Sequence, residues 1–229
     1  MLLNLFKLFN KSTEFLFTYL NNPKRANKKI LKYKIQKTKG KYSSMPKFIN
    51  FTFIFNELSK QNISGSLVEI GTAGGMSLAQ ITLLRNLYFK DKNIFSFDTF
   101  ENTHSDSPML KVSQLDDLCI PNLKNAGIKN PKKEIEFIVG DVNDTLVGFN
   151  QDICFLHIDV DIPSVYKVVL ENLWDNLVPN SFIIFDEYDD ENDIKKFGNM
   201  KKVIDTFLND KNYEKIEIES LSKFCIKKF

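Results

Sequence analysis

Acidic side chains stand at the ends of several short apolar segments of the sequence, and their number is the first sign of chemistry. These segments close on Glu69, Asp98, Asp159 and the adjacent pair Asp186 and Glu187. In parallel α/β sheets, ligands bind beyond the carboxyl ends of the strands, so such acids would gather at one edge. Gathered carboxylates repel one another unless some are protonated or a cation neutralises them.

A hard divalent ion is the simplest neutralising cation, because Mg²⁺ prefers carboxylate, water and substrate oxygens. The predicted metal ligands are Asp159, at the end of one apolar segment, and Asp186 and Glu187, at the end of the next. An ion held there would lower the pKa of a hydroxyl that it binds. The alternative to metal binding is that an acid begins a helix or lies in a solvated loop, and it applies to four acids: Asp161, Glu187, Asp189 and Asp190.

Residues 67–77, LVEIGTAGGMS, place a glycine-rich turn between an apolar run and a helical pattern. Three of the nine glycines, Gly71, Gly74 and Gly75, fall here, which indicates a backbone that turns sharply and lets a ligand approach. An ordinary strand-to-helix turn is the alternative. The turn lacks the GK[ST] of a P-loop and the GxGxxG of dinucleotide-binding folds. An NAD-linked oxidoreductase stays open, because an acid after the second strand also suits NAD.

Two acids have positions suited to a nucleoside. Asp98 ends the run NIFSFD, and a carboxylate at the end of a second strand can accept hydrogen bonds from both ribose hydroxyls. Asp141 follows the run EIEFIV, where the next turn would face the same edge. The two histidines are less informative. His157 lies inside an apolar strand and is interpreted as a core residue, whereas His104 lies in the long segment 99–130, which favours a lid or substrate loop.

The elements that would position these residues alternate between short apolar strands and helices. Strands are expected at 67–70, 93–98, 134–139, 153–159 and 180–186, and helices at 44–60, from 77, from about 112 to before Pro121, from 161–164 to about 177 and at 192–208. The runs YEKIEIES and KFCIKKF predict an antiparallel hairpin. The pattern predicts an α/β fold: a Rossmann-like, doubly wound, mostly parallel sheet with a C-terminal antiparallel β-hairpin, helices on both faces and an N-terminal helical extension.

Composition bounds the class of protein. The 229 residues suit one α/β domain at 44–229 and an appendage at 1–43, and the net charge of +2 gives no reason to expect a nucleic-acid partner. Three scattered cysteines predict reduced thiols and a cytoplasmic location. Residues 1–20 predict an amphipathic helix, or two short ones, that packs either on its own domain or on a second subunit of a homodimer, with a membrane surface as the alternative. The basic run 24–41 is interpreted as a solvated linker, with an anionic partner as the alternative.

Five motifs in order resemble the class I S-adenosylmethionine-dependent methyltransferases, and most closely the macrocin and mycinamicin sugar O-methyltransferases. The motifs are VEIGTAGGMS, FSFDTFEN, GDVNDTL, LHIDVDIPS and LVPNSFIIFDEYDD. The resemblance implies that the methionine end of S-adenosylmethionine lies against the first motif, the ribose against Asp98 and the adenine against Asp141 and the adjoining Val142. Within the first motif it assigns the cofactor to Glu69, Gly71, Thr72, Gly75 and Ser77.

The resemblance also implies that Asp159, Asp186 and Glu187 hold Mg²⁺. The family usually has a second Asp, or an Asn, at the position of Glu187. The catechol-type relatives carry a lysine where this chain has Ile162, so a lysine base does not transfer. The activity implied is O-methylation of a sugar or related small molecule, with catalysis assigned to Asp159 and proton acceptance to Asp161 or His104. A methyltransferase fold that serves only as a binding module is the non-enzymatic alternative.

Overall fold

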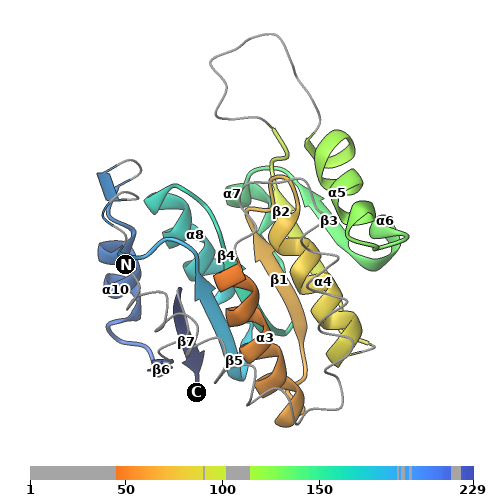
Figure 1. Ribbon diagram of the computed structural model, residues 1–229. Helices are drawn as coiled ribbons and strands as arrows, with labels where there is room; N and C mark the ends of the chain where they lie inside the picture. The colour runs from red at the N-terminus through yellow and green to blue at the C-terminus, as the bar shows by residue number, and fades with distance from the viewer. Residues whose placement is uncertain are drawn as a thin grey trace, which may run out of the picture.

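A seven-stranded sheet forms the centre of the protein in the computed structural model (Figure 1), which describes residues 45–89, 91–101, 114–189, 191, 194–195, 198–217 and 223–229. The strands are β1 (Ser66–Ile70), β2 (Ile94–Asp98), β3 (Glu136–Val139), β4 (Ile153–Ile158), β5 (Leu177–Phe185), β6 (Tyr213–Lys215) and β7 (Phe224–Lys228). Their order across the sheet is β3-β2-β1-β4-β5-β7-β6. The first five pair in parallel, and β7 is antiparallel to both β5 and β6, which confirms the predicted sheet and C-terminal hairpin.

Helices cover both faces of this sheet. They are α3 (Met45–Lys60), α4 (Met76–Tyr88), the π-helical turn η1 (Leu115–Cys119), α5 (Ile120–Asn125), α6 (Pro131–Glu134), α7 (Val142–Thr145), α8 (Pro163–Leu173) and α10 (Met200–Leu208). Alternating strand residues divide the core in two: Leu67 and Phe155 pack with α3, α4 and α5, whereas Val68 and Leu156 pack with α7, α8 and α10. This alternation is the two-residue period of a strand, and it confirms the doubly wound arrangement.

Helix α3 is held on β4 by a stripe of large apolar side chains. Phe51, Ile54, Phe55 and Leu58 follow helical spacing and are fully buried. The ring of Phe51 meets Phe155 edge-on, with centroids 5.6 Å apart. In Figure 1, α3 and α4 lie on the same side of the sheet, across β1 and β4. This packing brings the first turn of α3 to the carboxyl-terminal edge of the sheet.

Several predicted element boundaries are wrong. The third strand, expected from Glu134, begins only at Glu136, because Glu134 is the last residue of helix α6. The helix after β2 does not end before Pro121, because helix α5 continues from there to Asn125. The Ile120 N–H bonds to the Leu115 carbonyl and closes the π-helical turn. Pro121 then lies in the first turn of α5, where a residue needs no N–H donor. Helix α8, expected to run to about residue 177, ends at Leu173. Strand β5, expected from residue 180, begins at Leu177. The predicted helix 192–208 is interrupted at Gly198, which has a φ of 107°, and α10 starts only at Met200.

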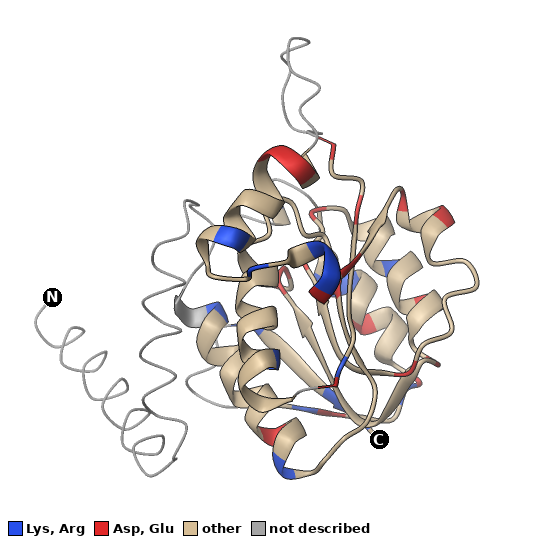
Figure 2. Cartoon of the chain, turned by 90° about the vertical axis from the view of Figure 1, so that its right-hand side faces the viewer, with Lys and Arg blue, Asp and Glu red and all other residues tan. Residues whose placement is uncertain are grey.

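Charged residues lie mainly on helices and loops, while the central strands carry few of them (Figure 2). No helix among the described residues combines the length and apolarity needed to cross a membrane. The predicted N-terminal helix and basic segment, and with them the predictions of a homodimer and of a membrane surface, fall on residues 1–43, outside the described residues.

Candidate active site

The glycine turn between β1 and α4 is pressed against the end of β4. Gly71 has a φ of 84°, and a Cβ placed on it would lie 1.9 Å from the carbonyl oxygen of Asp159. The Asp159 N–H also donates to the carbonyl of Ile70, at 2.9 Å. Glycine at position 71 is therefore required by contact within the protein, which joins the predicted cofactor turn directly to the predicted metal ligand.

The second half of the turn packs against the helical segment that follows β2. Gly75 has a φ of 76°, and a Cβ there would lie 2.6 Å from the Sγ of Cys119. Asn122 donates its side-chain amide to the carbonyl of Gly74, at 2.8 Å. Burial raises the pKa of the Cys119 thiol well above its usual value, so this sulfur is a neutral packing group. Segments far apart in the chain thus fix the shape of the turn together.

Asp98 binds the same turn from the end of β2. Its Oδ2 accepts hydrogen bonds from the backbone N–H groups of Thr72, at 2.6 Å, and Ala73, at 2.7 Å. Its Oδ1 accepts from the N–H of Phe100, at 2.6 Å. The carboxylate therefore lies at the sheet edge beside the turn, where the resemblance places a ribose, and it also orders the backbone around it.

A buried polar row runs across the sheet beneath α3. Glu69, Ser96 and His157 occupy matching positions on β1, β2 and β4, and all three are fully buried. Thr72 joins them, because its Oγ1 lies 2.7 Å from the Ser96 hydroxyl and donates to Glu69 Oε2, at 3.1 Å. Glu69 thus shapes the turn through Thr72 and presents no exposed surface of its own.

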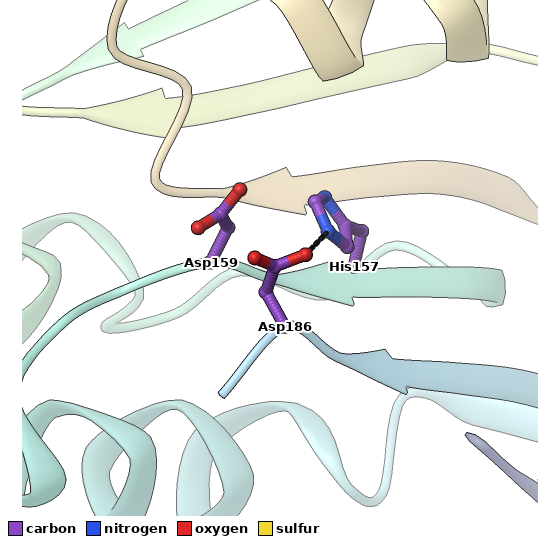
Figure 3. A group of neighbouring side chains, drawn as sticks. All are labelled: His157, Asp159 and Asp186. Atoms are coloured by element: carbon purple, nitrogen blue, oxygen red, sulfur yellow. Dashed lines mark ion pairs between the residues drawn. The ribbon is translucent and has the colours of Figure 1, made fainter. Parts of the chain in front are cut away.

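His157 connects this row to the end of β5. Its Nδ1 lies 3.0 Å from Glu69 Oε1, and its Nε2 lies 3.6 Å from Asp186 Oδ1 (Figure 3). Burial lowers the pKa of His157, but the carboxylates of Asp186 and Glu69 outweigh this effect and raise the pKa to about 9. The ring is fully buried, which agrees with the prediction of a core residue. It also links Glu69, which contacts the predicted cofactor turn through Thr72, to Asp186.

The predicted metal ligands Asp159 and Asp186 lie together at the ends of β4 and β5 (Figure 3). Asp159, Asp186 and His157 each offer one ligand atom, and these atoms lie within 4.8 Å of one another. A lysine occupies the same place: Lys47 Nζ, from the first turn of α3, lies 2.7 Å from Asp159 Oδ2 and 2.8 Å from Asp186 Oδ1. Lys223 Nζ adds a third contact, 3.1 Å from Asp186 Oδ2.

These contacts set the charge state of the acid pair. Burial would lower the pKa of Lys47, but the charges of Asp159 and Asp186 raise it above its usual value. Burial would raise the pKa of Asp186, but the ion pair with His157 and the charges of Lys47 and Lys223 hold it well below its usual range. Lysine and carboxylate are therefore both charged at neutral pH.

Glu187, the third predicted metal ligand, points toward helix α8. Its Oε2 accepts a hydrogen bond from the Tyr166 hydroxyl, at 2.6 Å, and that hydroxyl also lies 3.1 Å from the carbonyl oxygen of Ile158. Burial and the nearby charges of Asp159 and Asp186 raise the pKa of Glu187 to about 8. Glu187 stays a predicted ligand, and its contact with Tyr166 anchors the end of β5 to α8.

The remaining predicted residues lie along the same edge or outside the described residues. Asp141 is the N-cap of α7, where its Oδ1 accepts from the Asn143 N–H at 2.8 Å, and this hydrogen bond lowers its pKa. Val142 and Ser77 are buried at the starts of α7 and α4. Asp161 follows β4 and is partly exposed.

His104 falls on residues that the structure does not describe, so its assignment stays a prediction. Lys47, Lys223 and Tyr166 were missed because no local pattern marks them. Lys47 occurs in a helix more than a hundred residues before the acids that it contacts, and Lys223 comes from the hairpin. The one available signal was charge balance, since buried acids require a counter-ion from some part of the chain.

Solved structures with a similar fold include methyltransferases. The O-methyltransferase NovP matches with a TM-score of 0.64 and 17% identity, over 81% of this chain and 80% of that chain. CalS11, a TDP-rhamnose 3'-O-methyltransferase of calicheamicin biosynthesis, matches with a TM-score of 0.59 and 18% identity, over 79% of this chain and 77% of that chain. The Podospora anserina methyltransferase PaMTH1, bound to S-adenosylhomocysteine, matches with a TM-score of 0.57 and 12% identity, over 96% and 95% of the two chains.

Sequence comparison gives the family directly. No curated protein sequence matches the chain. The family model described as macrocin-O-methyltransferase (TylF), however, matches residues 45–221, which contain the glycine turn and all of the acids at the sheet edge. The chain therefore belongs to the macrocin-O-methyltransferase (TylF) family of S-adenosylmethionine-dependent O-methyltransferases.

Proposed function

We propose that this protein transfers the methyl group of S-adenosylmethionine to a hydroxyl of a sugar, glycan precursor or related small molecule in the cytoplasm. The observation that carries the proposal is the row of acids at consecutive strand ends, with Glu69 and Asp98 beside the glycine turn, Asp141 after the next strand and Asp159 next to Asp186. A saccharide acceptor is supported by the family and by CalS11, which acts on TDP-rhamnose. The reduced, buried state of all three cysteines supports the location.

The cofactor assignment follows the geometry of the turn. Asp98 already orders the backbone of Thr72 and Ala73 and has a partly exposed carboxylate, so it is the residue that we assign to the ribose hydroxyls. Asp141 and Val142 lie one strand further along the edge, and we assign them to the adenine. The methionine end would lie along the turn 71–77 beneath Asp159, which brings the reactive methyl group close to the acid pair.

The carboxylates also fit a divalent cation in type, since Asp159 and Asp186 offer oxygen ligands at one point and Glu187 lies beside them. A bound ion would supply the positive charge that lowers the pKa of a hydroxyl in contact with it. The chain positions the acceptor hydroxyl in line with the sulfonium, and methyl transfer breaks the carbon–sulfur bond, forms the new carbon–oxygen bond and releases S-adenosylhomocysteine. We assign the hydroxyl proton to Asp161 or His104.

Calorimetric titration with S-adenosylhomocysteine tests the cofactor site, and a panel of nucleotide-linked sugars tests the acceptor by the S-adenosylhomocysteine released. We expect micromolar binding, and at least tenfold weaker binding by Asp98→Asn, because the ribose loses a carboxylate acceptor. The matched control is Asp210→Asn, an exposed acid near α10 with a lysine neighbour. If the folded protein did not bind S-adenosylhomocysteine, the proposed activity would be wrong, and the alternative of a methyltransferase fold that serves only as a binding module would be favoured.

A further inference from the structure

Lys47 occupies the position that a divalent ion would take between Asp159 and Asp186. Its Nζ lies 2.7 Å from one carboxylate and 2.8 Å from the other, and its side chain is only 6% exposed. The contact with Asp159 is a charge-assisted hydrogen bond, and the contact with Asp186 is a close ion pair. Lys47 is therefore a buried cation that pairs with two acids from neighbouring strands at once.

We propose that Lys47 is a built-in counter-ion of the acid pair and that a divalent ion binds only when the Lys47 ammonium withdraws. The inference rests on the metal site of the proposed function. It adds that this chain neutralises the pair by itself when no ion is bound, and that its affinity for the ion is reduced by the competition.

Distance and charge make the two cations exclusive. A Mg²⁺ ion lies about 2.1 Å from its oxygen ligands. An ion on the oxygen that Lys47 contacts at 2.8 Å would thus be within about 5 Å of Nζ, in a buried setting where like charges repel strongly. The repulsion adds to that of Lys223, which contacts the other oxygen of Asp186 at 3.1 Å.

The structure also allows the ammonium to leave while the helix stays. Helix α3 is fixed by Phe51, Ile54 and Phe55, all one turn or more after Lys47 and all fully buried. The Lys47 side chain is a flexible chain of four methylenes that is attached at the first turn. Withdrawal of the ammonium therefore needs a change of side-chain rotamer and no displacement of the core.

Manganese binding to the neutral variant Lys47→Met tests the proposal. Mn²⁺ is the probe, titrated by calorimetry in the absence of cofactor. We expect Lys47→Met to bind Mn²⁺ at least tenfold more tightly than the wild type, because the competing charge is gone. Lys60→Met is the matched control, because Lys60 is on the same helix but its side chain is 63% exposed and forms an ion pair with Glu57, away from the acid pair. This variant should bind Mn²⁺ like the wild type. Equal affinity of Lys47→Met and wild type, or no Mn²⁺ binding by folded Lys47→Met, would overturn the proposal.

Two further measurements cover a Lys47→Met protein that does not fold. Lys47→Gln keeps an N–H donor for the carboxylates without the charge, and the same tenfold gain is expected of it. In the wild type, reductive methylation read by peptide mass spectrometry should find Lys47 protected, and saturating Mn²⁺ should make it reactive; continued protection at saturation contradicts the exclusion. Binding of S-adenosylhomocysteine is measured on the same samples, so loss of the cofactor proposal is recognised separately from loss of this one.

Discussion

At the scale of single residues, the candidate site consists of side chains that also stabilise the fold. Gly71 brings the predicted cofactor turn against Asp159, and Asp98 holds the turn by accepting hydrogen bonds from backbone N–H groups. His157 joins Glu69 to Asp186 through its two ring nitrogens. A change at any of these positions should therefore affect stability as well as ligand binding, and matched controls are needed to separate the two effects.

Gly71→Ala should be far more destabilising than Gly148→Ala. Both glycines have a positive φ, 84° and 76°, so the backbone cost of an alanine is similar, roughly 1 kcal/mol. Only at position 71 does the new Cβ meet the carbonyl of Asp159, at 1.9 Å, whereas a Cβ at 148 has nothing within 4 Å. We expect Gly71→Ala to lose roughly 4 kcal/mol or more of unfolding free energy. Equal urea midpoints for the two variants would contradict the close packing of turn and strand.

Asp98→Ala should lower the unfolding free energy by roughly 2 kcal/mol, because three backbone N–H groups lose a charged acceptor at a partly exposed site. Asp98→Asn keeps one acceptor oxygen and should lose less stability than Asp98→Ala. Thermal unfolding monitored by circular dichroism gives this order. Two variants with the same melting temperature as the wild type would show that these hydrogen bonds contribute nothing to the turn.

At the scale of elements, the sequence predicted where strands and helices lie better than where they end. Apolar runs located all five parallel strands; four of them, β1, β2, β4 and β5, are largely buried on both faces and leave a plain apolar signal, whereas β3 at the sheet edge is partly exposed. Boundaries depended on single residues whose effect is local geometry. Pro121 is tolerated after a π-helical turn, and Gly198 interrupts a helix through its positive φ. Neither outcome can be read from hydrophobic periodicity.

Tyr166→Phe tests how α8 is tied to the ends of β4 and β5. The Tyr166 hydroxyl is fully buried and contacts both Glu187 Oε2 and the carbonyl of Ile158. Its removal leaves buried polar groups without this partner, which should lower the unfolding free energy by roughly 1–3 kcal/mol. Tyr188→Phe is the control, because the Tyr188 hydroxyl bonds to Asp205 at an exposed site and should matter less. The prediction is wrong if urea unfolding ranks Tyr188→Phe as the less stable variant.

At the scale of the whole molecule, the carboxyl-terminal edge of the sheet collects residues from the entire described chain. The acids of this site could be predicted, since parallel topology carries the ends of successive strands to one edge. Their counter-ions could not, because Lys47 and Lys223 reach the edge from a helix and a hairpin whose docking depends on tertiary packing. For the same reason the sequence indicated a metal ion as the cation that neutralises the acids, whereas the fold also brings Lys47 and Lys223 to them.

The whole core should respond to alkaline pH through its buried thiols. Burial raises the pKa of Cys154 to about 11 and that of Cys225 still further, while thiols of the unfolded chain titrate near 8.5. Above about pH 9 the unfolded state binds fewer protons than the native state, so the unfolding free energy falls as pH rises, by up to about 1.4 kcal/mol per thiol and pH unit. Below about pH 8 both states keep their thiol protons and this contribution is constant.

Cys154→Ala removes one of these groups and should be less stable near pH 7, because it leaves a cavity, yet should lose stability less steeply between about pH 9 and 11. Urea unfolding across this pH range measures how steeply the unfolding free energy of wild type and variant falls with pH. Lysine titration affects the two proteins alike. Equal slopes would mean that the Cys154 thiol ionises in the folded core as readily as it does in the unfolded chain.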